Sequence, residues 1–163
     1  MKLKQIIDES FGDYKECAML LIAPHCTFKC AGCQNHHLKL LETQNFPDEE
    51  IWDRFLFNPF SKAIVIGGLE PFENIIDICK FIVAGSKLDM PVPIVIYTGY
   101  EKDELEKPSF MYFNSFVKFK EVAKEYAGPV IVKFGRYIKD KPSKFEPLLG
   151  VELASDNQYA LQY

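Results

Sequence analysis

No stretch of this sequence is apolar for long enough to cross a membrane. The longest uninterrupted apolar run covers residues 18–24, whereas a spanning helix needs about 20 such residues. Residues 1–9 are too polar and acidic for a signal peptide. Gly (9) and Pro (10) are close to average usage in these 163 residues, which argues against disordered and collagen-like structure. We therefore expect a cytoplasmic protein without a membrane partner, built as a single domain over 1–163.

An excess of basic residues is also missing. Lys and Arg number 19 against 23 Asp and Glu, which gives a net charge of −4. Proteins that bind phosphate backbones are usually basic, at least on one face, so we expect no nucleic-acid partner. The one Lys-rich stretch, residues 133–144, is interpreted as a solvated loop.

The five cysteines are the most informative residues. An odd number of cysteines in a cytoplasmic chain argues against a disulfide framework and favours metal binding or catalysis. Cys26, Cys30 and Cys33 fall within eight residues of one another. Cys17 and Cys79 stand apart from them, and we expect these two to be small buried apolar residues.

Apolar segments alternate with amphipathic ones along the chain. Strands are expected at 17–23, 63–66, 93–97 and 130–133, and a short one near 159–162. Helices are expected to begin at Asp48 and at Pro71, and a third to run from about 109 to 126. Their predicted buried faces are Ile51, Trp52, Phe55 and Leu56 in the first helix, and Ile75, Ile76, Cys79, Ile82 and Val83 in the second. This alternation predicts an α/β fold with a mainly parallel sheet.

Three candidate functional segments follow predicted strands. These are the cysteine loop at 24–37, Gly67-Gly68, and Thr98-Gly99. Ligand sites of parallel sheets gather at the carboxyl ends of the strands, so the pattern predicts that the three segments form one site.

The cysteine spacing indicates a metal centre. The loop has a C-x3-C-x2-C pattern, and thiolates in such a loop are typical ligands of an iron–sulfur cube. Three ligands leave one iron open, as a reactive site requires. The alternative is a zinc site completed by a histidine, in a non-catalytic binding module. We expect His25, His36 and His37 to tune polarity or bond to backbone.

Beyond the cysteines, the chain resembles the radical S-adenosylmethionine (SAM) superfamily. Gly67-Gly68-Leu69-Glu70-Pro71 is similar to its SAM-binding motif, although Leu69 separates the glycines from the acidic residue. Gly32, Asn35, Tyr97-Thr98-Gly99-Tyr100 and the segment 155–158 resemble one branch, the activating proteins of anaerobic ribonucleoside-triphosphate reductase. The resemblance covers roughly residues 14–158.

The resemblance implies a fold, two cofactors and a set of site residues. The fold would be an open partial (βα) barrel of the radical SAM type. One [4Fe-4S] cluster would be bound by Cys26, Cys30 and Cys33, with SAM on its open iron. The residues implied in SAM binding are Gly32, Cys33, Gln34, Gly67, Gly68 and Glu70. Glu70 would accept a hydrogen bond from the SAM ammonium, or would act only as a helix-terminal carboxylate. Phe28 would shield the cluster from water.

The implied activity is that of a glycyl-radical-enzyme activase. The reduced cluster would split SAM, and the resulting carbon radical would take a hydrogen atom from a glycine of the reductase's large subunit. The electron would come from a donor such as flavodoxin or ferredoxin. Because the cofactors carry the chemistry, no catalytic side chain beyond them is expected. The alternatives are activation of another glycyl radical enzyme and another small radical SAM activity.

Overall fold

The computed structural model describes residues 1–88 and 90–163 and is organised around a six-stranded sheet of order β10-β7-β6-β5-β3-β2. The four central strands are parallel, and they are β3 (Ala18–Ile22), β5 (Ala63–Gly67), β6 (Ile94–Tyr97) and β7 (Val130–Phe134). The edge strands β2 (Gln5–Ser10) and β10 (Tyr159–Gln162) are antiparallel to their neighbours. The largely parallel α/β sheet is thus confirmed, and the assignment to a radical SAM barrel stays a prediction.

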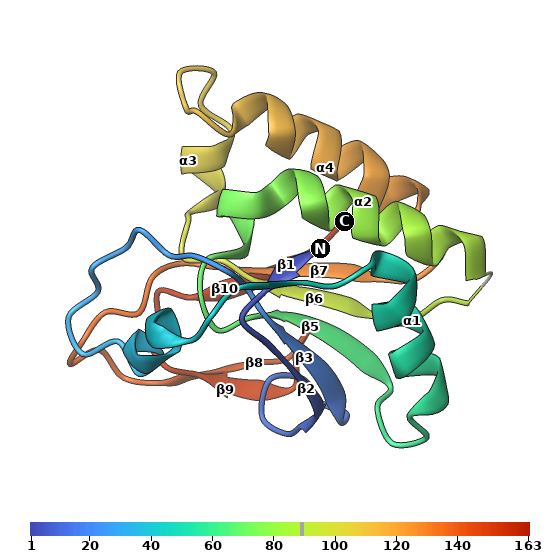
Figure 1. The fold of residues 1–163 in the computed structure, drawn as a ribbon. Coiled ribbons are helices and arrows are strands. Elements are labelled where there is room, and N and C mark those ends of the chain that lie inside the picture. Colours follow the sequence, from blue (N-terminus) through green and yellow to red (C-terminus); the bar gives the residue numbers. More distant parts are fainter. Residues whose placement is uncertain (89) are drawn as a thin grey trace.

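Helices cover one face of this sheet. In Figure 1, α2 (Ile75–Gly85) and α4 (Phe113–Glu125) lie side by side above it, and α1 (Asp48–Phe57) packs beside α2. The hairpin of β8 (Lys144–Glu146) and β9 (Val151–Leu153) lies on the other side of the sheet (Figure 1). Six short elements complete the fold, namely β1 (Lys2–Leu3), η1 (His36–Leu40), β4 (Gln44–Asn45), η2 (Pro71–Asn74), η3 (Ser86–Leu88) and α3 (Lys102–Leu105).

Side chains of the parallel strands alternate between two cores, because successive residues of a strand point to opposite faces. In β5, Ile64 and Ile66 join the large core under the helices, whereas Ala63 and Val65 join the smaller core under the hairpin. Both faces of the central strands are therefore buried. This explains why these strands appear in the sequence as continuous apolar runs.

Several predicted details are wrong. Ile76 and Val83 of α2 are 60% and 48% exposed, whereas the rest of the predicted face is buried together with Ile78 and Phe81, which the prediction did not include. Leu56 of α1 is also 39% exposed. The helix expected from residue 109 begins at Phe113.

Lys133 corrects the interpretation of 133–144 as a solvated loop. It belongs to the strand expected at 130–133, which runs on to Phe134 as β7, and its side chain is buried. Strand β2 and the β8–β9 hairpin were not expected from the sequence, since neither has a strong alternating pattern.

In the part of the chain that the structure describes, none of the helices has both the length and the apolar character that a membrane span requires.

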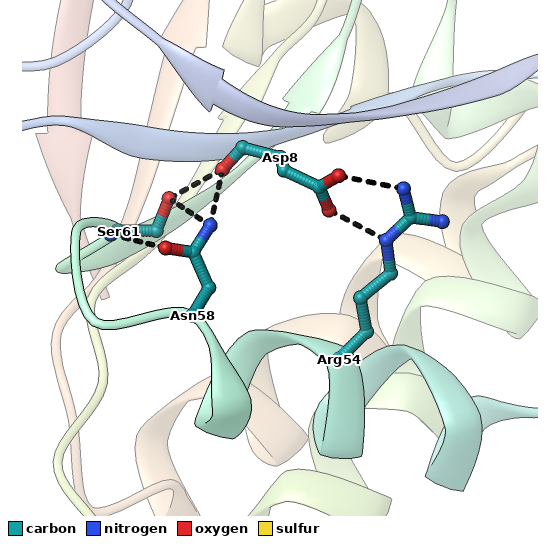
Figure 2. A network of polar contacts seen from close by, with 4 residues as sticks. All are labelled: Asp8, Arg54, Asn58 and Ser61. Atoms are coloured by element: carbon teal, nitrogen blue, oxygen red, sulfur yellow. Dashed lines mark hydrogen bonds and ion pairs between the residues drawn. The ribbon is translucent and has the colours of Figure 1, made fainter.

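A polar network fastens the edge strand β2 to α1 and to the turn before β5 (Figure 2). Arg54 forms a two-pronged ion pair with Asp8, with nitrogen–oxygen distances of 2.5 and 2.7 Å. The backbone carbonyl of Asp8 accepts hydrogen bonds from the Asn58 amide (3.0 Å) and the Ser61 hydroxyl (2.5 Å). These contacts satisfy a backbone group that β3 does not reach, because the β2–β3 register shifts between Ile7 and Ser10.

Trp52 fixes the position of α1 against α2. Its ring stacks on Phe81 at 4.8 Å, and its indole N–H donates to the Phe81 carbonyl at 3.0 Å. The ring also lies over Gly85, where an added Cβ would come within 2.2 Å of Trp52 Cζ2. Glycine at position 85 is therefore required by close packing.

We expect Gly85→Ala to lower the free energy of unfolding by about 1–3 kcal/mol, because a methyl group cannot fit against Trp52. At an unobstructed helical position the same change would stabilise the protein by roughly 0.5–1 kcal/mol. Urea unfolding of the single variant and of Gly85→Ala in a Trp52→Phe background checks this. An equal cost in both backgrounds would contradict the packing explanation.

Candidate functional site

One cavity of about 740 Å³ lies at the carboxyl ends of the parallel strands, over the face of the sheet that carries the hairpin. Its volume is in the range of pockets that hold cofactors and other small molecules. Its lining includes Cys26, Cys30 and Cys33 together with Gly67-Gly68 and Thr98-Gly99. The three segments that the sequence analysis assigned to one site are therefore brought together.

The cysteine loop is fastened to the segment that follows β5. Ala23 N–H donates to the Gly67 carbonyl at 2.9 Å, and Glu70 N–H donates to the His25 carbonyl at 2.8 Å. Further along, Glu73 accepts two hydrogen bonds from Thr27, one from its N–H at 2.8 Å and one from its hydroxyl at 2.6 Å. These contacts hold the loop on both sides of Cys26.

A tight turn places the other two cysteines. Cys33 N–H donates to the Cys30 carbonyl at 3.3 Å, and Gly32 within this turn has a φ of +73°. Residues with a Cβ rarely adopt that conformation. Gly32 is therefore explained by the backbone geometry of the turn.

The three thiols fit the iron–sulfur cluster predicted from the sequence. All three are free, half-buried and part of the same cavity wall. Burial raises the pKa of Cys26 above its ordinary value, so binding of this thiol to a metal would release a proton. Among residues 1–88 and 90–163, no three Cys, His, Asp or Glu side chains form a group that could hold a single metal ion.

Gly67 and Gly68 form the cavity wall at the end of β5. Gly68 has a φ of +76°, and an added Cβ would lie 2.9 Å from Ile22 Cδ1 and 3.1 Å from Leu38 Cδ1. A Cβ on Gly67 would lie 3.2 Å from Tyr97 Cβ. Only backbone can therefore form this part of the wall.

Glu70 is a buried carboxylate that lines the cavity and joins two loops. One oxygen accepts from the Thr98 hydroxyl at 2.7 Å and from Phe72 N–H at 3.0 Å, and the other accepts from Gly99 N–H at 2.7 Å. Burial raises the pKa of Glu70 to about 7, although these three hydrogen bonds lower it. Its first oxygen also caps η2, so the geometry matches the helix-terminal carboxylate that was one of the two predicted roles.

Lys133 is a cavity residue that the sequence analysis missed. Its ammonium is buried, donates to the Gly135 carbonyl at 2.9 Å, and lies 5.5 Å from the centre of the Tyr97 ring. Burial lowers the pKa of Lys133 to about 8. A signal was present in the sequence, because a lysine interrupts the apolar residues of β7 at a position that alternation places on the same face as Ile131.

The C-terminal segment 155–158 packs against the residues that follow β7. Gln158 lines the cavity, donates to the Gly135 carbonyl at 3.1 Å, and accepts from Ser155 N–H at 3.2 Å. The Asn157 amide donates to the Arg136 carbonyl at 3.0 Å. This segment therefore positions the same part of the wall that carries Lys133.

The remaining candidates from the sequence are the three histidines, the two isolated cysteines, Gln34 and Asn35. His25, His36 and His37 are exposed, and His37 Nδ1 lies 3.0 Å from the Gln34 carbonyl, in agreement with a backbone contact. Cys79 is buried in α2 as expected, whereas Cys17 is only half-buried, and its Sγ lies 3.9 Å from the Ser61 hydroxyl oxygen. Gln34 and Asn35 are exposed and line the cavity mouth.

We expect Glu70→Ala to lower the free energy of unfolding by at least about 3 kcal/mol, because it leaves three buried donors without an acceptor. The matched control is Glu73→Ala, which removes only the exposed contact to Thr27 and should cost less than about 1 kcal/mol. Urea unfolding of the apoprotein measures both changes. Equal costs for the two variants would show that Glu70 does not join the two loops as described.

The same carboxylate has a pH signature. Because the folded-state pKa of about 7 lies above the ordinary 4.5, the contribution of Glu70 to stability is complete below pH 4.5 and is lost as the pH rises through 7. The difference in unfolding free energy between the wild type and Glu70→Gln should therefore decline over this range. A difference that grew with pH would have the wrong sign.

A family model described as the 4Fe-4S single cluster domain matches residues 15–148, which is most of the chain. The matched segment contains the cysteine loop, Gly67-Gly68, Glu70 and Lys133. No curated protein and no solved structure shows significant similarity to the chain. Together with three free thiols at a single cavity, this match shows that the chain belongs to the 4Fe-4S single cluster domain family of iron–sulfur proteins.

Proposed function

We propose that this iron–sulfur protein is a radical SAM activase that generates a glycyl radical on anaerobic ribonucleoside-triphosphate reductase. The observation that carries the proposal is the shared cavity, in which three thiols lie with a glycine wall and a buried ammonium. Iron–sulfur proteins that only transfer electrons commonly use four cysteines. Three thiols beside a cavity of this size fit a cluster that also binds a small molecule.

The cluster ligands in this proposal are Cys26, Cys30 and Cys33. The loop that carries them is fixed by backbone and by Glu73 rather than by a helix or strand. Phe28, between the first two ligands, is partly buried against the large core and is positioned to limit the access of water. An apolar surrounding of this kind influences the reduction potential of a cluster.

The residues that would hold SAM form the rest of the cavity. Gly67 and Gly68 would allow close approach of the amino acid part, because their positions have no room for a Cβ. The Lys133 ammonium would pair with the SAM carboxylate, because buried charges are normally paired. Gln34 would lie beside the adenine, as the family resemblance implies. Glu70 would act through the Gly99 loop, because its oxygens already accept three hydrogen bonds.

When bound, the reduced cluster would supply the electron for reductive cleavage of SAM, which would lead to removal of a hydrogen atom from a glycine of the reductase. The task of the chain is to orient SAM and to exclude water. No proton needs to be held or moved by a side chain, which agrees with a wall in which the carboxylate of Glu70 is already hydrogen-bonded.

Exposed apolar side chains near the cavity support a protein substrate. Phe11, Leu40 and Ile138 are 77%, 85% and 43% exposed, and each adjoins a residue of the cavity wall in the sequence. An open sheet leaves this side of the cavity to be closed by something else. A reductase subunit that brings a glycine loop into the cavity would both supply the substrate and exclude solvent. The electron would come from a flavodoxin or a ferredoxin.

Cluster content tests the ligand assignment. We expect Cys26→Ala, Cys30→Ala and Cys33→Ala each to lose most of the bound iron and sulfide after anaerobic reconstitution, because an iron would lack its thiolate. Cys17→Ser and Cys79→Ala are the controls and should keep the wild-type content. Full iron and sulfide in any of the three variants, or a colourless wild type with stoichiometric zinc, would contradict the assignment.

Product formation tests the activity. Reconstituted protein reduced with dithionite should convert SAM to 5′-deoxyadenosine and methionine, and with the intact reductase it should give a glycyl radical signal in electron paramagnetic resonance. In Gly68→Ala the strained φ should lower the free energy of unfolding by roughly 1–2 kcal/mol. The loss of SAM binding free energy in this variant should be larger. Gly150→Ala is the control, because Gly150 has a similar φ of +71° and a crowded Cβ position but is not among the described residues of the cavity wall, so it should lose stability and retain affinity.

The outcomes separate the alternatives. SAM cleavage without a radical on the reductase would indicate another glycyl radical enzyme or a small-molecule substrate. Equal radical yields on the reductase and on a free peptide of its glycine loop would show that the body of the partner is not needed to close the cavity. A fully loaded cluster that cleaves no SAM would overturn the proposal.

A further inference from the structure

The ring of Phe28 is held on three sides. Gly99 lies against one side, where an added Cβ would come within 2.6 Å of the ring carbon Cε2. The edge of Tyr100 lies against another, with ring centres 4.8 Å apart. The guanidinium of Arg136 lies over the ring, 4.4 Å from its centre. This ring belongs to the loop between Cys26 and Cys30, so whatever fixes it also fixes the loop.

Arg136 is itself fixed by a carboxylate. One guanidinium nitrogen lies 3.0 and 3.1 Å from the two oxygens of Glu104. Burial would raise the pKa of Glu104, but hydrogen bonds from Glu101 N–H and from Arg136 outweigh it and leave the pKa below its ordinary value. Glu104 is therefore charged at neutral pH, and Arg136 is one half of an ion pair at the wall of the cavity.

Of the two charged residues, Arg136 is the one that contacts the cysteine loop and lies in the cavity wall. Arg136 contacts Phe28 and lines the cavity, whereas Glu104 lies in α3 and is not part of the wall that the structure describes. Lys39 adds a second cation near the loop, since its ammonium donates to the Phe28 carbonyl at 3.0 Å. Two cations therefore contact Phe28, while the carboxylates of Glu70 and Glu73 lie on the Cys26 side of the loop.

A fixed positive charge beside an iron–sulfur cluster favours the reduced form, because reduction adds one negative charge. Arg136 and Glu104 are 37% and 32% exposed, so water and salt screen them only in part. We propose that Arg136 is a positioning residue that fixes Phe28, and with it the cysteine loop, and raises the midpoint potential of the cluster, with Glu104 as its opposing charge. This inference depends on the cluster at Cys26, Cys30 and Cys33, but not on SAM cleavage or on the identity of the reductase.

The test is a redox titration of the reconstituted protein without SAM, with dithionite as the one-electron reductant and electron paramagnetic resonance of the reduced cluster as the readout. Arg136→Gln should shift the midpoint potential to more negative values, and Glu104→Gln should shift it to more positive values. Arg136→Lys, which keeps the charge, should lie closer to the wild type than Arg136→Gln does. These shifts should shrink as the ionic strength rises.

Matched controls come from an exposed ion pair on α4. Lys118 and Glu121 lie 3.2 Å apart, with side chains 66% and 57% exposed. Lys118→Gln and Glu121→Gln change the net charge by the same amounts as the test variants and should leave the midpoint potential unchanged. They separate a local effect of Arg136 and Glu104 from an effect of net charge.

Opposite shifts for Arg136→Gln and Glu104→Gln support the proposal, because a merely structural role would move both potentials in the same direction. Shifts of the same sign, or no shift in either variant, would overturn it. If Arg136→Gln fails to load iron and sulfide, Glu104→Gln decides the question alone, and a potential equal to or below that of the wild type would overturn the inference. Loss of the cluster in the wild type would instead reject the ligand assignment.

Discussion

The carboxylate of Glu70 is the interaction on which the candidate site depends. Its oxygens accept hydrogen bonds from η2 and from the two residues that follow β6. The backbone N–H of Glu70 donates to the carbonyl of His25. The ends of β3, β5 and β6 are therefore joined at one buried point. Because Gly99 is fixed there, Phe28 has a surface to pack on, and the cysteine loop takes its position from that ring.

The cavity combines groups that are costly to bury. Burial raises the pKa of Glu70 to about 7 and lowers that of Lys133 to about 8, so neither group favours its charged form as strongly as it would in water. Perturbed groups of this kind concentrate at functional sites. The alternation of β7 carries Lys133 onto the face that the hairpin covers, where a purely structural core would have placed an apolar residue.

Much of the fold and the outline of the site could be predicted from the sequence. Buried parallel strands such as β5 give continuous apolar runs, and the rule that sites lie at the carboxyl ends of strands brought Cys26, Gly68 and Gly99 together. The edge strand β2 was missed because its residues are partly polar and its pairing depends on Asp8 and a distant turn. Lys133 and Arg136 were missed because their importance comes from contacts with distant residues, which periodicity does not reveal.

The Phe28 contacts also bear on the order of events during synthesis. The cysteine loop leaves the ribosome early, but Glu70, Gly99 and Arg136, which fix it, lie up to 108 residues further along. Domains form their long-range contacts only when all partners have been made. A nascent chain would therefore present the three thiols on an unsupported loop for most of its synthesis. The wall of the candidate site is complete only after β7 has joined the sheet, so full support of the cysteine loop is a late event in folding.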